Sequence, residues 1–371
     1  MKGSRYWLIA LALVFVITLA ACAAPAEPAP APERPTPTTP APQAPTPTAP
    51  SSLYEAAKKE GEISFWTHSL QDSELFLKFF ESKYPSVKLK VWDARSPDLI
   101  AKVTEEAKVG KFSVDVISVP DLDMNHLKDL LVVYDWPATR DWEQLYKPSH
   151  NLWRFYGSAP KLPVYNTDLV SAAEAPKTLD DLKNTKWRGR SINSTSNDQL
   201  PLIYAWLWGE GGKLNWDKSL AFWQEVVDNT RPRVMSGFEG AVGLVTAGDV
   251  VLHQMSSLTT YFRYKWKGAP IALVALDQVP STMWAVAIAK NAPHPNAARL
   301  FADFFTSAEA QVFFANGQGA LASSPEAARK AKPNLELVEK GLKIFIAPPE
   351  VYTVENTLKA QEFWSKAMRG R

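Results

Sequence analysis

Between residues 51 and 130 the chain alternates amphipathic and short apolar stretches, and this alternation constrains the fold more than any other feature. Apolar side chains recur at helical spacing in residues 51–61, 72–84, 96–110 and 121–130, with Ser96 expected to cap the third of these helices. Residues 62–67, 87–93 and 114–119 have the pattern of strands. Strands that alternate with helices predict a mostly parallel sheet flanked by helices, so the expected fold class is α/β.

Residues 193–319 also show predicted strands and helices in succession. A possible strand leads into a polar loop at 193–198, and helices are expected at 199–212, 217–229 and 239–248, followed by a strand at 249–255. A strand at 283–290 and helices at 295–307 and 307–319 complete the pattern. The body from residue 51 onward is too long for one typical core and predicts two domains.

Residues 1–21 have the pattern of a secretory signal peptide. Lys2 and Arg5 precede an uncharged run from Tyr6 to Ala20, which is shorter than the ~20 residues that a membrane-spanning helix needs. The only cysteine, Cys22, follows Leu-Ala-Ala, and this segment resembles the lipobox of bacterial lipoproteins. The resemblance implies cleavage before Cys22 and acylation of its sulfur, so Cys22 is expected to be a lipid anchor; an incidental thiol is the alternative.

Residues 22–50 are expected to form a tether, in which the lipidated Cys22 is followed by a Pro/Ala/Thr-rich linker. The 11 prolines after Cys22 exclude a packed core and favour an extended spacer of up to roughly 85 Å. Loss of residues 1–21 leaves 39 basic against 39 acidic residues. A neutral chain lacks the excess of cations that nucleic-acid binding requires, so no nucleic-acid partner is expected.

Seven segments, in order, resemble extracellular solute-binding proteins of ABC importers, and in particular the iron(III)/polyamine/phosphonate-type receptors. They include "LYEAAKKEGEISFWT", "VYNTDLV", "VTAGDVVL" and "KGAPIALVALDQ", and the similarity runs from about residue 53 to 324. The resemblance implies a two-lobed type II periplasmic-binding-protein fold, in which each lobe has a mixed, mostly parallel sheet flanked by helices. It assigns residues 51–163 plus 279–325 to lobe 1 and residues 164–278 plus 326–371 to lobe 2, with one crossing near Tyr165.

The same resemblance implies a function. A receptor of this kind closes on a small ligand and delivers it to an ABC permease, and we expect a monomer without a cofactor. Its expected location is the cell envelope, lipid-anchored on the outer face of the cytoplasmic membrane, on the extracellular or periplasmic side. A ligand sensor for a membrane kinase would use the same fold and remains an alternative.

An exported enzyme is the less favoured class. The one thiol is assigned to the anchor, and the sequence contains no G-x-S-x-G, H-E-x-x-H or Gly-rich phosphate loop. The five histidines show no metal-binding spacing. We therefore expect no catalysis, although a Ser/His/Asp set assembled in space stays open.

Ligands of such sheets lie beyond the carboxyl ends of the strands, and this rule defines the candidate site. The candidates from the first lobe are Trp66, Thr67, His68, Ser118, Asp121 and Trp284. The candidates from the second lobe are Ser194, Thr195, Ser196, Asn197, Glu239, Gly240, Thr259, Thr260 and Tyr261. Glu239 and Gly240 are expected to open a helix whose first amides could face an anion.

The ligand is the least determined feature. Ferric-binding members of the family carry a tyrosine pair where this chain has Thr259 and Thr260, and threonine hydroxyls do not deprotonate to bind iron. Hydroxyls and amides suit phosphate, phosphonate or carboxylate, so a small organic molecule or anion is favoured and no metal is expected.

Two other ligands stay open. A rearranged ferric site would use His68, Asp121, Tyr261 and Tyr264. A polyamine would need several carboxylates, for which Glu239, Asp93 and Asp121 are candidates.

Overall fold

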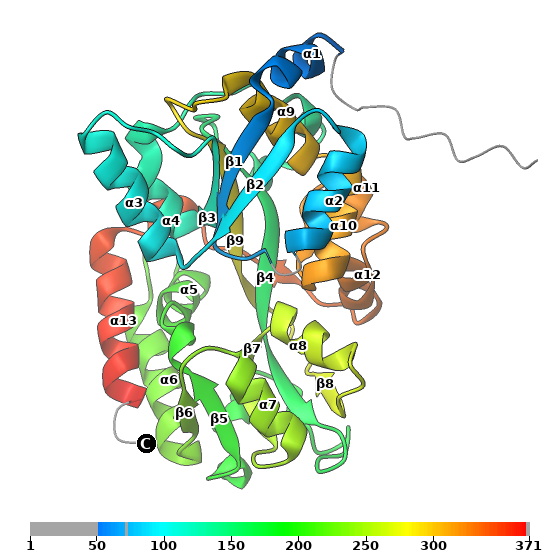
Figure 1. Ribbon diagram of the computed structural model, residues 1–371. Helices are drawn as coiled ribbons and strands as arrows, with labels where there is room; N and C mark the ends of the chain where they lie inside the picture. Colours follow the sequence, from blue (N-terminus) through cyan, green and yellow to red (C-terminus); the bar gives the residue numbers. More distant parts are fainter. Residues whose placement is uncertain (1–50, 71–72, 369–371) are drawn as a thin grey trace, which may run out of the picture. The chain divides into compact units, whose positions relative to one another are not determined.

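The computed structural model describes residues 51–70 and 73–368 (Figure 1). The expected signal peptide, Cys22 and the linker lie outside the described residues. The longer helices are α1 (Ser51–Glu60), α2 (Ser73–Lys83), α3 (Ser96–Lys108), α5 (Leu200–Leu207), α6 (Trp216–Thr230), α7 (Glu239–Ala247), α8 (Leu258–Lys265), α9 (Pro295–Phe305), α10 (Ala308–Gln318), α12 (Lys332–Glu339) and α13 (Val354–Met368). Two short helices are α4 (Asp121–Met124) and α11 (Pro325–Ala328).

The first part of the sheet confirms the parallel arrangement expected for residues 62–119. Strand β1 (Glu62–Thr67) pairs in parallel with β2 (Lys88–Asp93) and with β3 (Val116–Pro120). Strand β9 (Val279–Ile288), which comes much later in the chain, lies antiparallel beside β3. The short strand β11 (Ile344–Phe345) pairs in parallel with the beginning of β9.

The second part of the sheet is built from strands in the middle of the chain. Strand β5 (Ser191–Ser194) pairs in parallel with β6 (Arg233–Met235) and with β7 (Leu252–Ser257). Strand β8 (Ile271–Leu273) completes this part. The helix α13 packs against α5 and α6 (Figure 1), and the Trp364 indole donates a hydrogen bond of 3.0 Å to the Ser194 carbonyl.

Strand β4 (Trp153–Asn166) belongs to both parts of the sheet. Its residues 153–160 pair antiparallel with β9 and its residues 161–166 pair with β7 and β8 (Figure 1). The sequence predicts a crossing near Tyr165 and a return around residues 275–281, but this strand was not predicted. The physical reason is that nearly every residue of β4 is buried, so apolar and polar residues do not alternate, and Pro160 and Pro163 argue against a central strand.

Local details of the helices follow ordinary capping chemistry, with one correction. The predicted cap at Ser96 is wrong, because Ser96 is already helical and Arg95 is the N-cap residue, without a side-chain cap. Pro97 fits the first turn, where a backbone N–H has no partner inside the helix. Helix α10 ends at Gly319, whose φ of +70° closes the helix in the left-handed conformation.

The core beneath β1 is aromatic. The Phe65 ring packs against Phe301 and Phe305 of α9 at centroid distances of 4.8 and 5.3 Å, and Phe76 of α2 joins the same cluster. Each fully buried phenylalanine contributes roughly 1.5–3 kcal/mol relative to an exposed one. This packing fixes β1, whose carboxyl end leads to the candidate site.

A buried carboxylate ties the first strands to α9. Asp115, which is fully buried, accepts hydrogen bonds from the Ser64 and His294 backbone amides at 2.8 and 2.7 Å. The His294 ring nitrogen Nδ1 lies 2.9 Å from the same carboxylate. One side chain therefore connects β1, the residue before β3 and the beginning of α9.

We predict that Asp115→Ala lowers the free energy of unfolding by about 3 kcal/mol, because it leaves two partly buried amides and the imidazole without their acceptor. Urea unfolding of the full chain measures this change. The matched control is Asp135→Ala, which removes an exposed ion pair with Arg140 and should cost less than ~0.5 kcal/mol. Equal losses in the two variants would contradict the role given to Asp115.

Candidate ligand-binding site

Strand ends and helix beginnings surround a cavity of about 400 Å³. One wall comes from the end of β1, from Pro120 and from β9, and the other comes from η6 (Thr195–Asn197), α5, α7 and α8. Strand β4 contributes Ala159 and Lys161 between them. The sequence-predicted residues that line this cavity are His68, Ser196, Asn197, Glu239, Thr259, Thr260 and Trp284.

The other residues predicted from strand ends do not line this cavity. Trp66 packs edge-on against Trp92 at 4.7 Å, with the Lys102 ammonium 5.3 Å from its ring. The buried Ser118 hydroxyl lies 2.9 Å from the Tyr156 hydroxyl, and the buried Thr67 hydroxyl accepts a bond from the Ser69 amide. Successive side chains of a strand point to opposite faces, so Trp66, Thr67 and His68 do not all turn toward one cleft.

Three further predicted residues, Ser194, Thr195 and Gly240, lie near the cavity but do not line it. The Ser194 hydroxyl accepts a hydrogen bond from the Ser196 amide and so shapes the turn that presents Ser196 and Asn197. Thr195 is exposed outside the cavity lining, and Gly240 packs against the Met235 sulfur.

Asp121 lines a different cavity, of about 450 Å³, together with His150 and Trp153. Burial raises the pKa of the Asp121 carboxyl to about 7, although the Leu122 amide partly opposes the rise by donating a hydrogen bond to it.

The two tyrosines considered for iron are engaged elsewhere. The Tyr261 hydroxyl donates to Glu336 at 3.3 Å, and the Tyr264 hydroxyl donates to the Glu239 carbonyl at 3.0 Å. Burial, followed by the charge of Glu336, raises the pKa of Tyr261 far above its ordinary value. A tyrosine in this environment resists the loss of its proton that iron binding requires.

Lys161 is the main residue that the sequence analysis missed. It lies on β4 where pairing changes from β9 to β7, and its ammonium lies 4.1 Å from the centre of the Phe238 ring. Burial lowers the pKa of Lys161 to about 8, and the charge of Asp198 opposes this in part. Lys161 was not predicted as a site residue because the sequence pattern does not identify β4 as a strand.

Arg263 is the second missed cation. It lies on α8 one turn after Thr259 and Thr260, so the three side chains share one face of the helix. The Arg263 guanidinium pairs with the Glu239 carboxylate, which also accepts a hydrogen bond of 3.3 Å from the Thr260 hydroxyl. The helical spacing of residues 259, 260 and 263 was a signal that could have revealed Arg263.

His68 supplies an uncharged ring to the opposite wall. Burial lowers the pKa of His68 to about 4, against the effect of its hydrogen bond to Ser118, so the ring is neutral at pH 7. Nδ1 lies 3.2 Å from the Ser118 carbonyl oxygen, which can only accept. Nδ1 therefore carries the proton, and Nε2 has a free lone pair.

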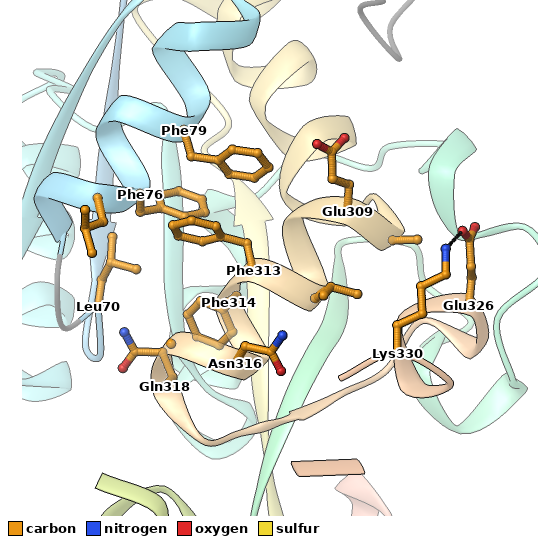
Figure 2. A pocket seen from close by; sticks show the side chains of 14 residues that line it. Leu70, Phe76, Phe79, Glu309, Phe313, Phe314, Asn316, Gln318, Glu326 and Lys330 are labelled. Carbon is orange, nitrogen blue, oxygen red and sulfur yellow. Dashed lines mark hydrogen bonds and ion pairs between the residues drawn. The ribbon is translucent and has the colours of Figure 1, made fainter. Parts of the chain in front are cut away.

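A third cavity, which is apolar and has a volume of about 610 Å³, lies between α2 and α10. In Figure 2 the rings of Phe79 and Phe313 face each other, with centroids 4.6 Å apart, and Lys330 reaches Glu326. It contains none of the predicted site residues, and Lys330, the one cation among the described residues that line it, is paired with Glu326. The cavity with Lys161 and Arg263 is therefore the candidate site.

Two properties of the described residues bear on function. Within 51–70 and 73–368, no three His, Cys, Asp or Glu side chains gather in a way that could hold a metal ion. In the same ranges, no helix has the length and apolar character needed to cross a membrane.

Comparisons with known proteins define the class. The family model "Bacterial extracellular solute-binding protein" matches residues 76–337, more than half of the chain. The chain belongs to this family. Membership implies a small-molecule ligand, an ABC permease as partner, and a periplasmic or extracellular location.

Individual relatives are more distant. The chain is 35% identical over 81 residues to the Fe(3+)-binding periplasmic protein of Serratia marcescens, a match that spans 21% of this chain and 24% of that relative. Iron-bound HitA from Pseudomonas aeruginosa has a TM-score of 0.68 at 16% identity, with 82% of this chain and 99% of HitA covered. AfuA from Actinobacillus pleuropneumoniae, with fructose-6-phosphate bound, has a TM-score of 0.65 at 19% identity, with 84% and 99% covered. These structures confirm the α/β periplasmic-binding-protein fold.

We predict a pH-dependent stability difference between the ligand-free chain and Lys161→Met. The pKa of Lys161 is lower in the folded state than in the unfolded state, so folding costs free energy while the ammonium stays protonated in both. Lys161→Met should therefore be more stable by ~1 kcal/mol at pH 7, and the advantage should shrink as pH rises from 8 to 10.

Urea unfolding at pH 7, 8, 9 and 10 measures this difference. Lys218→Met, which removes an exposed lysine beside Trp208, is the matched control and should show no such trend. A stability advantage that grows with pH would contradict the assignment.

Proposed function

We propose that the protein is a membrane-tethered extracellular receptor that closes on a small organic anion and delivers it to an ABC permease. The observation that carries the proposal is the placement of Lys161 and Arg263, from β4 and α8, in one cavity lined by hydroxyl groups. We expect the receptor to act as a monomer, without catalysis and without a cofactor.

The charges around the cavity favour an anion. Lys161 and Arg263 contribute two cations, Glu239 contributes one anion, and His68 is neutral at pH 7. The carboxylate of Glu239 pairs with Arg263 but leaves Nε of the guanidinium without a partner in the described part of the chain. A ligand carboxylate or phosphate would form a further charge-assisted hydrogen bond with this guanidinium. Ser257 and Thr259 share one hydrogen bond of 2.8 Å between their hydroxyls, so one O–H of this pair is free to donate, and the first amides of α8 supply further donors.

Ferric iron remains the second candidate, because the Serratia marcescens relative is described as a Fe(3+)-binding periplasmic protein and the HitA structure as iron-bound. His68 Nε2 could serve as a metal ligand. The engaged hydroxyls of Tyr261 and Tyr264, and the position of Asp121 in another cavity, weigh against the rearranged ferric site. A sensor role beside a membrane kinase would use the same ligand site.

We further propose that two lobes close on the ligand, with residues 51–163 plus 279–325 in one and 164–278 plus 326–371 in the other. The change of β4 from β9 to β7 between Pro160 and Lys161 supports the first boundary to within a few residues. The C-terminal segment contacts both, because α12 packs against α10 while α13 packs against α5 and α6.

The anion site has a direct test. We predict that an organic anion, presented to the purified full chain in detergent, raises the Tm by several degrees, and that Arg263→Met weakens its binding at least 30-fold because the bidentate charge partner is lost. Thermal shift and calorimetry would compare inorganic phosphate, organic phosphates, carboxylates, polyamines and ferric nitrilotriacetate. Lys218→Met should bind as the unmodified chain does.

A shift with ferric nitrilotriacetate alone would overturn the anion proposal in favour of iron. Loss of binding in Lys218→Met to the same extent as in Arg263→Met would show that the loss is not specific to the site.

We propose that acylated Cys22 tethers the receptor to the outer face of the cytoplasmic membrane, with residues 23–50 as the spacer. We predict that Cys22→Ser moves the protein from the membrane fraction to a soluble or unprocessed form, because acylation requires the thiol. Cell fractionation and intact-mass measurement of the N-terminal peptide test this. A membrane-bound Cys22→Ser protein with a cleaved signal would contradict the lipid anchor.

A further inference from the structure

Four residues that line the candidate site each carry a buried polar atom that lacks a hydrogen-bond partner among the described residues. These atoms are His68 Nε2, Asn197 Oδ1, Gln199 Oε1 and Arg263 Nε. Buried polar groups are nearly always paired in folded proteins. Four unpaired groups around one cavity therefore point to partners that a ligand supplies.

Three of the four are acceptors. His68 Nε2 accepts because Nδ1 carries the proton toward the Ser118 carbonyl. The amide of Asn197 is oriented by its own bonds, since Nδ2 donates to Asn193 Oδ1 at 2.9 Å and to the Met255 carbonyl at 2.7 Å. Oδ1 of Asn197 is thus left as an acceptor, and Gln199 adds a second amide oxygen.

These acceptors call for donors on the ligand. An unmade hydrogen bond to a buried group costs about 1–3 kcal/mol, so a ligand that satisfies several of them gains much of its affinity there. Sulfate and an ionised fatty acid offer no such donors, and inorganic phosphate near pH 7 offers only one or two. The unpaired Arg263 Nε and the Lys161 ammonium require an acceptor with negative charge in the same molecule.

We propose that the ligand is an organic anion that carries several hydroxyl groups, with its anionic group at Lys161 and Arg263 and its hydroxyls at His68, Asn197 and Gln199. This inference rests on the proposed anion-receptor function. A phosphate ester of a polyol and a polyhydroxy carboxylic acid share this chemistry. The edge of the Trp284 ring, beside His68 at a centroid distance of 5.6 Å, would pack against the carbon skeleton.

The test compares ligands of equal charge and similar length. D-Gluconate is paired with hexanoate, and glucose 6-phosphate with hexyl phosphate, in calorimetric titrations of the full chain in detergent. At least one hydroxylated member should bind 30-fold or more tightly than its partner, and the pair that shows the difference identifies the anionic group.

A variant of Gln199 then distinguishes a role in ligand recognition from a purely structural role. Gln199→Met removes the unpaired acceptor and should weaken binding of the hydroxylated ligand about 10-fold. The affinity for the matched ligand without hydroxyl groups should stay unchanged. Gln224→Met is the matched control on α6, where the glutamine bonds to Asp228 away from the cavity, and should change neither affinity. An equal loss for both ligands in Gln199→Met would indicate a purely structural role and overturn the assignment of Gln199.

The remaining outcomes distinguish this inference from the proposed function. If hexanoate or hexyl phosphate binds as tightly as its hydroxylated partner and binding still requires Arg263, the anion receptor stands and the polyhydroxy ligand is wrong. If none of the four anions binds, or if ferric nitrilotriacetate alone binds, both are overturned.

Discussion

The pairing of β4 with β9 along one half and with β7 and β8 along the other is the constraint on which the remaining structure depends. Lys161 comes first in the half that pairs with β7, directly after the last residue that pairs with β9. The strand ends that carry His68 and Ser257 are positioned through this ladder, since β1 reaches β4 through β3 and β9. A one-residue slip of β4 would turn Lys161 to the other face of the sheet and remove a cation from the cavity.

The cavity keeps polar groups in an unfavourable ligand-free state. Burial disfavours the charge of Lys161, and the Phe238 ring and the charge of Asp198 offset this only in part. Arg263 shares Glu239 with Thr260, and its Nε has no partner among the described residues. Sites that bind ligands commonly retain such unsatisfied groups, because an interaction completed by the ligand contributes to affinity rather than to folding.

Elements with regular periodicity were predictable, and the site was predictable only where it follows such elements. The strands at 62–67 and 88–93 and the helices α1, α6 and α9 agree with the expected ranges to within a few residues. Thr259, Thr260, Ser196 and His68 were expected from strand ends and do line one cavity. Trp66 and Tyr261 were named with them but are buried against neighbours, because side-chain direction alternates in strands and rotates in helices.

The sequence by itself determined the α/β class, the family resemblance and the order of the elements, because these depend on local periodicity and on short segments contiguous in the chain. It did not reveal β4, whose residues are buried on both faces and so lack alternation. Only the tertiary structure decided that Lys161 and Arg263, about a hundred residues apart, line the same cavity, and that the hydroxyls of Tyr261 and Tyr264 are engaged elsewhere. These relations depend on the register of paired strands and on the face that each helix presents, which local sequence does not specify.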